Sequence, residues 1–333
     1  MSTIIGDIVT LGGGGLELVA NVADGATVTA TLGSKTVTGV SSGGQARLKI
    51  PQEGKWTVSA TNGMIVSDPR EISVPATVDI ILMSHELNDN SWDAIKQAAD
   101  ANIGANFWSV GDCKEVTLTG KVSDGLTLTS YTAWVFIIGF NHNAVREGNG
   151  IAFQGFKATK NGTPVCLTDS GYEHYKTSGT WFNMNNSKTS AGGWQASLMR
   201  KNVMPLIKAA LPSDLQAVIK SSTIYTDNTG GGTAGVVPTT TQDEVFLLAE
   251  YEVFGTHYNA SSHEQDYLKQ YSYYSAGNSR VKYRHNDTSA AVYWWERSPS
   301  LASSSRFCYV YGNGGSGTEN ANGSEGVSPC FKV

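Results

Sequence analysis

Apolar and polar residues alternate in short runs through the first part of the chain. Turn-forming pairs such as Asp24-Gly25 and Asn62-Gly63 separate these runs. Five runs have a period of two: Thr27–Leu32, Lys35–Val40, Arg47–Ile50, Trp56–Ala60 and Glu71–Val74. Because short strands with regular turns are typical of small sandwiches, residues 16–83 are predicted to form a β-sandwich. The apolar positions expected in its core are Val28, Ala30, Leu32, Val37, Leu48, Ile50, Trp56, Val58, Ile72 and Val74.

A run of four glycines, Gly12 to Gly15, precedes this segment. Since glycine runs are flexible, residues 1–15 are predicted to be a flexible or attachment peptide. The stretch from Ile4 to Leu11 could add a strand to a partner protein, or it could be a disordered terminus. The sequence leaves both alternatives open.

The pattern changes after residue 83, and residues 84–333 are predicted to form a second, β-rich domain of α+β type. Helices are expected at Ser91–Asp100, at Gly193–Ala210 with an interruption at Pro205, and at Glu264–Ser275. The nearly continuous apolar run Trp134–Phe140 predicts a central strand covered on both faces. Two closing strands are expected around Arg306–Tyr311 and Val327–Val333, with a Gly/Asn/Ser loop between them.

The low charge of the chain narrows the range of partners. Charged residues make up 16% of the sequence, the net charge is −5, and no run of Lys or Arg is present. Binding to nucleic acid through phosphate neutralisation is therefore not expected. No apolar run approaches the length of about 20 residues that crosses a membrane, so no membrane insertion is expected. The first residues lack the basic and apolar regions of a signal peptide, which favours folding in a cytoplasm.

The four cysteines are scattered and form no CxxC pair. In a protein that folds in a cytoplasm, Cys113, Cys166, Cys308 and Cys330 are expected to be reduced and partly buried. A bridge between Cys308 and Cys330 is the alternative, and the sequence does not provide the Cα separation that would decide it.

Two short motifs characterise the N-terminal segment: Gly25-Ala26-Thr27-Val28 and Pro51-x-x-Gly54-x-Trp56-Thr57-Val58. With them, residues 26–61 resemble the immunoglobulin-like, carboxypeptidase-regulatory-like modules of surface and virion proteins. This resemblance implies that residues 16–83 act as an immunoglobulin-like spacer.

A longer set of motifs follows in the second domain. They are Trp92-x-x-Ile95, Val110-Gly111-Asp112, Gly192-Gly193-Trp194, Leu198-Met199-Arg200, Asp243-Glu244-Val245-Phe246-Leu247-Leu248, Tyr293-Trp294-Trp295-Glu296-Arg297-Ser298-Pro299 and Gly326-Val327-Ser328-Pro329-Cys330-Phe331. In this order they resemble a family of phage and prophage structural proteins with a C-type-lectin-like C-terminal domain of unassigned function. The resemblance implies a small immunoglobulin-like β-sandwich followed by a C-type-lectin-like domain. It also implies a virion protein that is assembled in the cytoplasm of a bacterial host, with other virion proteins as partners.

The double-tryptophan motif is predicted to be structural. Two adjacent Trp side chains bury a large aromatic area, and a proline then turns the chain. The acidic and basic residues between them could tie this turn to the core. We therefore assign a scaffold role to Trp294, Trp295, Glu296, Arg297 and Pro299.

The segment that follows is the best candidate for ligand binding. Tyr309 and Tyr311 share one face of a predicted strand, and they point outward if Val310 points inward. Tyr, Ser, Gly and Asn are the residues that paratopes use for adaptable contacts. A solvated loop with no ligand is the alternative, and the composition is also compatible with diversification by a retroelement. The predicted ligand-binding residues are Ser304, Arg306, Tyr309, Tyr311, Asn313 and Asn320.

No motif in the sequence indicates catalysis, an obligatory metal or a cofactor. HExxH, GxSxG, Walker and GxGxxG motifs are absent, as are the Glu-Pro-Asn and Gln-Pro-Asp signatures of calcium-dependent sugar sites. We therefore interpret the chain as a phage tail-fibre or tail-tip adhesin, with a bacterial surface glycan or protein as its ligand and a homo-oligomeric state. The alternatives are a capsid-decorating or head-fibre protein and, in another class, a cell-wall glycan hydrolase. A carboxylate pair facing across a deep cleft would favour the hydrolase.

Overall fold

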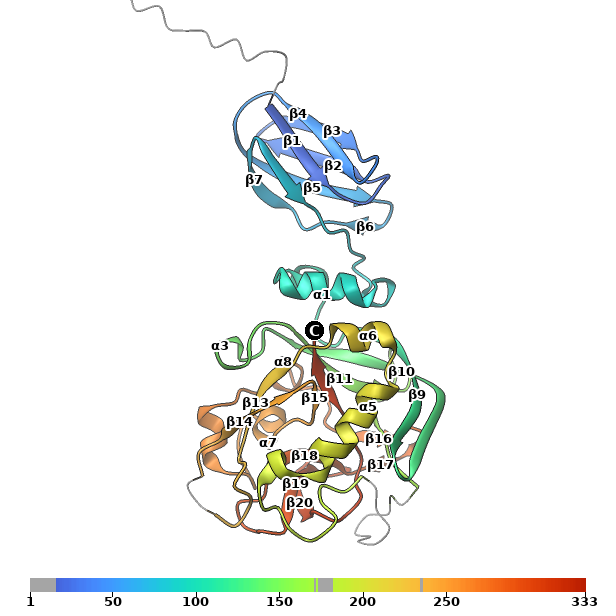
Figure 1. Ribbon diagram of the computed structural model, residues 1–333, viewed down its shortest axis with the longest axis vertical. Helices are drawn as coiled ribbons and strands as arrows, with labels where there is room; N and C mark the ends of the chain where they lie inside the picture. The colour runs from blue at the N-terminus through green and yellow to red at the C-terminus, as the bar shows by residue number, and fades with distance from the viewer. Residues whose placement is uncertain (1–15, 171, 173–181, 234–235) are drawn as a thin grey trace, which may run out of the picture. The chain divides into compact units, whose positions relative to one another are not determined.

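Strands are the main elements of the chain, which forms a β-rich fold with several sheets (Figure 1). The computed structural model describes residues 16–170, 172, 182–233 and 236–333. By their contacts, these residues divide into two compact units, Met1–Asn90 and Ser91–Val333. The boundary predicted from the sequence lies between residues 83 and 84. Residues 1–15, predicted to be a flexible or attachment peptide, lie outside the described residues.

The alternating runs near the N-terminus form two sheets. One has the order β4-β1-β8, and the other has the order β3-β2-β5-β6 with β7 paired to β5. The elements of this unit are β1 (Leu16–Asn21), β2 (Thr27–Leu32), β3 (Lys35–Val40), β4 (Gln45–Ile50), β5 (Gly54–Asn62), β6 (Ile65–Val66), β7 (Arg70–Val74), β8 (Ala76–Asp79) and the short helix η1 (Leu87–Asp89).

The period of two places alternate side chains in one shared core. Trp56 in β5 is 0% exposed, and most of the predicted core side chains are buried with it. Leu32, Val37 and Ile72 are only partly buried and pack against this core. The strands β1, β6 and β8 were not predicted, because none of them shows a clear alternation between two turn signals.

The second unit contains all the remaining elements. Its helices are α1 (Trp92–Asp100), α2 (Gly104–Phe107), α3 (Ala144–Glu147), α4 (Gly193–Ala196), the π-helix η2 (Met199–Val203), α5 (Met204–Ala210), α6 (Ser213–Val218), α7 (Glu250–Phe254), η3 (Ser262–Asp266) and α8 (Ser272–Ser275). Its strands are β9 (Cys113–Ser123), β10 (Leu126–Phe140), β11 (Ile151–Lys157), β12 (Val165–Cys166), β13 (Ser222–Thr226), β14 (Thr239–Asp243), β15 (Val245–Phe246), β16 (Lys282–Arg284), β17 (Asp287–Val292), β18 (Trp294–Pro299), β19 (Arg306–Val310), β20 (Ser316–Asn320) and β21 (Cys330–Lys332).

A five-stranded sheet with the order β15-β21-β11-β10-β9 forms the centre of this unit. The prediction of a central strand is confirmed, since β10 pairs with both β9 and β11 and its residues 135–138 are 0% exposed. The helix α5 packs against β9 (Figure 1). The last strand, β21, lies between β15 and β11, so the C-terminal residues belong to the core of the sheet.

The predicted helices have mixed outcomes. The first is confirmed as α1, and the Ser91 hydroxyl caps it by accepting the Ala94 N–H at 3.1 Å. The second divides into α4, η2 and α5, and Pro205 stands in the first turn of α5, directly after the π-helix η2. The third prediction, one helix over Glu264–Ser275, is wrong. There the chain forms η3 and α8 separately, because the Tyr271 N–H between them bonds to the Glu252 carbonyl oxygen at 3.0 Å.

The last strands of the chain are β18, β19 and β20, which form a three-stranded sheet, and β21, which belongs to the central sheet. The strand β20 was expected to be a loop, but it pairs with β19 from Ser316 to Asn320. All five residues of the predicted scaffold motif lie in β18 and are buried: Trp294, Trp295, Glu296, Arg297 and Pro299. The four cysteines are free, as expected, so the alternative bridge between Cys308 and Cys330 is wrong. They were expected to be partly buried, and all four are buried.

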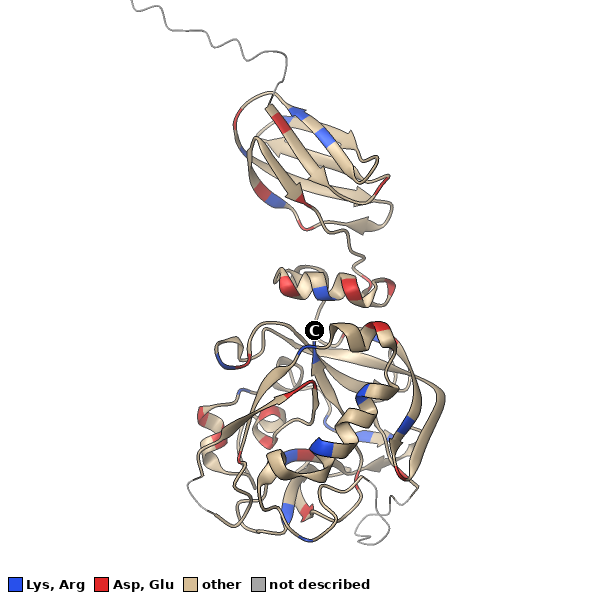
Figure 2. Cartoon of the chain, in the orientation of Figure 1, with Lys and Arg blue, Asp and Glu red and all other residues tan. Residues whose placement is uncertain are grey.

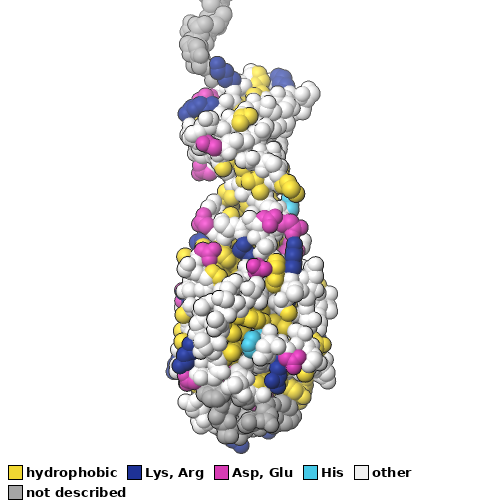
Figure 3. All heavy atoms as spheres, turned by 90° about the vertical axis from the view of Figure 1, so that its right-hand side faces the viewer, with side chains coloured by type: hydrophobic (Ala, Val, Ile, Leu, Met, Phe, Trp, Pro, Cys, Tyr) yellow, Lys and Arg dark blue, Asp and Glu magenta, His cyan; other side chains and the backbone are white. Residues whose placement is uncertain are grey.

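Charged side chains are sparse and of mixed sign on both units (Figure 2). On the face of the second unit that Figure 3 shows, apolar side chains lie among polar surface, with acidic and basic groups at separate points. Among the helices of the described residues, none has the length and apolar character to cross a membrane.

Candidate functional site

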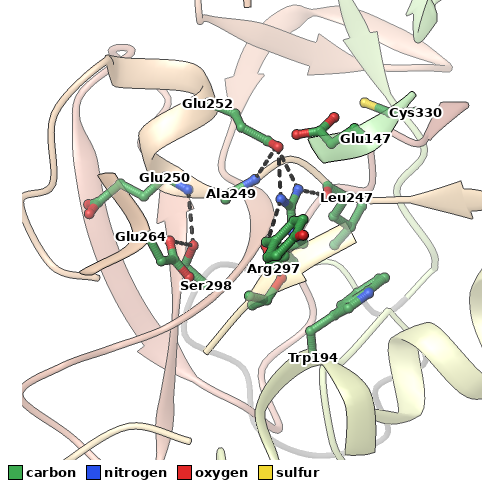
Figure 4. A network of polar contacts seen from close by, with 12 residues as sticks. Glu147, Trp194, Leu247, Ala249, Glu250, Glu252, Glu264, Arg297, Ser298 and Cys330 are labelled. Carbon is green, nitrogen blue, oxygen red and sulfur yellow. Dashed lines mark hydrogen bonds and ion pairs between the residues drawn. The ribbon is translucent and has the colours of Figure 1, made fainter. Parts of the chain in front are cut away.

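A buried arginine in the second unit joins three elements (Figure 4). Arg297 in β18 donates to the Glu252 carboxylate of α7 from Nη1 and Nη2, at 2.6 and 2.8 Å. Its other N–H groups bond to the Thr226 hydroxyl and to the carbonyl oxygens of Leu247 and Tyr225. The side chains of the ion pair are 0% and 1% exposed. Because the planar guanidinium uses all its donors, it fixes β18, α7 and the end of β13 relative to one another.

A second buried carboxylate holds two surface loops. Glu250, the first residue of α7, accepts the backbone N–H groups of residues 258–260 at 2.8–3.1 Å. It also accepts the Ser316 hydroxyl, to which Asn259 Nδ2 donates at 2.8 Å. The loop after α7 and the turn that leads into β20 are therefore anchored to one buried charge.

Two further buried glutamates lie beside this anchor. Glu264 accepts the Ser298 hydroxyl at 2.7 Å. Burial raises the pKa of Glu264 to about 7, although the bond from Ser298 lowers it. Glu296 in β18 is 0% exposed, and neither of its carboxylate oxygens has a hydrogen-bond partner. Burial raises the pKa of Glu296 well above its ordinary value, and the neighbouring Glu250 carboxylate raises it further.

We call five residues of the anchored loops the loop platform: Tyr258, Asn259, Leu301, Asn313 and Ser316. Asn313 belongs to it as part of the turn that leads to Ser316. The Leu301 N–H donates to the Asn259 carbonyl oxygen at 2.7 Å, which joins the loop after β18 to the loop after α7. Tyr258 is 66% exposed and Leu301 is 36% exposed, and Asn313 is also exposed. Exposed Tyr and Asn side chains on a fixed backbone are suited to contact with a ligand.

The predicted ligand-binding residues divide between the two ends of the β19–β20 hairpin. Arg306 and Asn320 face each other at one end, where Ser304 is also close in sequence. Tyr311 and Asn313 lie in the turn beyond the other end, and Asn313 alone belongs to the loop platform. The structure therefore does not bring the six predicted residues into one site.

The exposure of these residues also differs from the prediction. Ser304, Arg306 and Asn313 are exposed, and Tyr311 and Asn320 are half-buried. The expectation that Tyr309 points outward is wrong, because Tyr309 is only 1% exposed. Consecutive residues Phe307–Val310 of β19 are all buried, so both faces of the strand are covered and alternation along it does not separate core from surface.

Three tyrosines, Tyr293, Tyr309 and Tyr311, pack together near the turn that follows β19. The Tyr309 ring lies 5.0 Å from the Tyr311 ring and 5.4 Å from the Tyr293 ring, in edge-to-face contacts. The Tyr311 ring also covers Gly317, where a Cβ atom would lie 2.6 Å from the ring. Tyr311 is thus held partly against the sheet, and a ligand would meet only its free edge.

Tyr258 is the main surface residue that the sequence reasoning missed. It follows α7 in the segment Gly255-Thr256-His257-Tyr258-Asn259, whose composition matches that of the predicted binding loop. The Gly/Tyr/Asn composition of this segment could therefore have indicated a second binding loop. Glu250 was also missed, although a carboxylate directly after the apolar run Leu247-Leu248-Ala249 indicates a buried charge with a structural role.

A cleft of about 570 Å³ lies elsewhere on the second unit, between α5 and the strands β14 and β15. Its acidic side chains form ion pairs with neighbouring Arg and Lys side chains. Asp243 pairs with Arg200 at 2.6 Å, and Glu244 pairs with Lys208 at 2.7 Å. The two carboxylates are adjacent in sequence and each is bound to a cation, which is not the arrangement that a glycosidase acid and base require.

Comparison with known proteins identifies one similarity. Residues 172–333, just under half of the chain, are similar to a family described as a domain of unknown function (DUF6273). No curated protein and no solved structure matches the chain.

Proposed function

We propose that this chain is a structural protein of a phage virion, a tail-fibre or tail-tip adhesin that binds a bacterial surface glycan or protein. In this proposal, the first unit is an immunoglobulin-like spacer and the second is a C-type-lectin-like display domain. The proposal is supported by the motifs in the sequence and by the two-sheet first unit.

The single observation that carries the binding role is the anchoring of the loop platform. The backbone at Tyr258 is held by the buried Glu250 carboxylate, while the residue as a whole is 66% exposed. A loop that is already ordered loses little conformational entropy when it binds, so its contacts contribute more of their energy to affinity. An exposed aromatic ring beside Asn and Ser side chains can stack on a sugar face and bond to its hydroxyl groups.

The test is the binding of the labelled full chain to a panel of intact bacterial strains. The double variant Tyr258→Ala/Asn313→Ala is expected to bind at least tenfold more weakly than the original chain, because it removes an aromatic contact and a polar contact. Val145→Ala is the matched control, since Val145 is 99% exposed and lies in α3, outside the platform.

Two results would contradict the adhesin proposal. The first is binding to none of the strains, and the second is equal binding by the double variant and the control. Location of the protein on the head of the particle in a cryo-EM map would instead support the capsid-decorating or head-fibre role. The same map would establish the oligomeric state, for which a fibre implies a trimer.

A further inference from the structure

Two groups of buried side chains in the second unit could hold a metal ion. One consists of His142, Glu147 and Glu252, and the other consists of Glu250, Glu296 and Cys308. Within each group, the atoms that could bind a metal all lie within 4.8 Å of one another. All six side chains are buried.

Charge balance distinguishes the two groups. In the first, Glu147 pairs with Lys332 at 2.7 Å and Glu252 pairs with Arg297 at 2.6 Å, so both carboxylates already have a buried cation. A metal ion there would be repelled by two positive charges at close range. This group therefore has no unbalanced negative charge for a metal to neutralise, although His142 Nε2 is buried without a hydrogen-bond partner.

In the second group, no Lys or Arg among the described residues forms an ion pair with the carboxylates. Glu250 accepts its hydrogen bonds from backbone N–H groups and from neutral Asn and Ser side chains. The adjacent Glu264 likewise accepts only from the Ser298 hydroxyl and from the Asp227 N–H. Glu250, Glu264 and Glu296 are all 0% exposed, so up to three negative charges lie in the core without a hydrogen-bonded cation.

Glu296 is a buried carboxylate without hydrogen bonds. Both of its carboxylate oxygens are buried and have no hydrogen-bond partner. Cys308, also 0% exposed, makes one long polar contact of 3.9 Å, to the Pro299 carbonyl oxygen. Buried polar groups in native proteins are almost always satisfied, so the open oxygens of Glu296 point to a partner that is not a protein atom.

The fold brings these side chains together from three elements. Trp295 of β18 pairs with Tyr309 of β19 before the register becomes irregular, and the ligand atoms of the adjacent Glu296 and Cys308 lie within 4.8 Å of each other. The first residue of α7, Glu250, is held beside β18 because its N–H donates to Ser298 Oγ at 3.1 Å. Because Glu296 and Cys308 lie on neighbouring strands and the Glu250 N–H is bonded to a side-chain hydroxyl of β18, the meeting of the three side chains is a feature of the fold.

We propose that Glu296 and Cys308, with Glu250 as the third ligand, bind one divalent cation of the zinc class. Zinc accepts both thiolate and carboxylate ligands, whereas calcium and magnesium require oxygen ligands only. A tetrahedral zinc ion with bonds of about 2.0–2.3 Å separates its ligand atoms by about 3.3–3.8 Å. Shifts of less than about 1 Å would bring the three groups to these distances. Three protein ligands leave the fourth position for a water molecule.

The cation has a structural role in this proposal. It would join α7, β18 and β19, and it would neutralise the carboxylates around Glu296. Through Glu250 it would also stabilise the loops of the platform. The proposal does not depend on the adhesin role, and it departs from the expectation of no obligatory metal that the sequence motifs favour.

The experiment measures the metal directly. The full chain is expressed in zinc-supplemented medium, purified without chelator and analysed by mass spectrometry under native conditions. We expect about one zinc ion per chain. Growth with cobalt should instead give a thiolate-to-cobalt absorption band, which is a signature of a cysteine ligand.

Two matched pairs of variants assign the ligands. Cys308→Ser should abolish the cobalt band, while Cys330→Ser, at another thiol that is 0% exposed, should retain it. Glu296→Gln should lower the zinc content at least tenfold, while Glu319→Gln, at a carboxylate that is 4% exposed in β20, should not.

The results that overturn the proposal do not require a stable variant. If the original chain contains less than about a tenth of an equivalent of both metals, no such site exists and Glu296 is a neutral acid. Metal that is retained in Cys308→Ser and Glu296→Gln would also contradict the assignment. Loss of metal together with unchanged platform binding would uphold the cation site and remove only its support of the loops.

Discussion

Gly193 is a position at which the structure accepts no side chain larger than a hydrogen atom. It has a positive φ of 51°, and a Cβ atom at this position would lie 2.0 Å from the Asp227 carbonyl oxygen. The Gly192-Gly193-Trp194 motif is thus explained by close approach of two backbones. This approach positions the buried Trp194 ring, whose Nε1–H donates to Asp243 at 2.9 Å.

We expect Gly193→Ala to lower the free energy of unfolding of the second unit by more than about 3 kcal/mol, because a clash with backbone adds to the strain of the positive φ. Gly277→Ala is the control, since Gly277 also has a positive φ, of 84°, but has no atom within 4 Å of the added Cβ. The control should lose only about 1 kcal/mol. Urea unfolding followed by tryptophan fluorescence measures both, and equal losses would contradict the clash.

Elements of the second unit are joined by buried charge as well as by apolar packing. The ion pair of Arg297 and Glu252 connects β18 to α7 across 45 residues of sequence. Removing one partner leaves the other charge buried without compensation, which is far more costly than losing a surface pair. The geometry therefore makes this pair a condition for docking α7 against the last sheet.

Arg297→Met is expected to destabilise the second unit by about 3–5 kcal/mol. The double variant Arg297→Met/Glu252→Met should recover a large part of this loss, because it leaves no unpaired charge in the core. In the first unit, Arg47→Met removes an ion pair to Glu17 whose side chains are 57% and 41% exposed, and it should cost less than about 1 kcal/mol. Calorimetry of the four proteins tests this order, and a double variant as unstable as Arg297→Met would refute the explanation.

At the scale of the whole second unit, buried histidine makes folding sensitive to acid. His142 is 7% exposed, and its ring stacks on the Tyr271 ring with the centroids 3.5 Å apart. Burial lowers the pKa of His142 from 6.5 to about 3, although the nearby Glu252 raises it. The unfolded chain therefore binds a proton that the folded chain does not, at every pH between these two values. Stability should fall as the pH decreases from about 6.5 towards 3.

His142→Phe retains an aromatic ring for stacking and removes the titration. Between pH 6.5 and pH 3, its free energy of unfolding should decline less steeply with acid than that of the original chain, by up to about 1.4 kcal/mol per pH unit. Urea unfolding at several pH values measures the two slopes. Parallel curves for the two proteins would show that His142 takes up its proton without unfolding.

Local patterns predicted much of the fold. The strands β2, β3, β4, β5 and β7 of the first unit follow from alternation and turn pairs. The helix α1 follows from its Ser91 cap, and β10 follows from a long apolar run. In each case the signal lies within a few residues of the element, because side-chain periodicity and capping are local properties of the backbone. The elements that escaped prediction, such as β20, have compositions that are equally compatible with a loop.

The candidate site depended on contacts between distant parts of the chain. Alternation along Arg306–Tyr311 could not reveal that β19 is covered on both faces, so Tyr309 was assigned to the surface although it is 1% exposed. Nor could the sequence bring Glu250 to Ser316, 66 residues away, or place Glu296 beside Cys308 without the register of β18 and β19. Strand register and burial are properties of the assembled core. Many element types could therefore be predicted from residue order, whereas the loop platform and the buried carboxylates emerged only from three-dimensional packing.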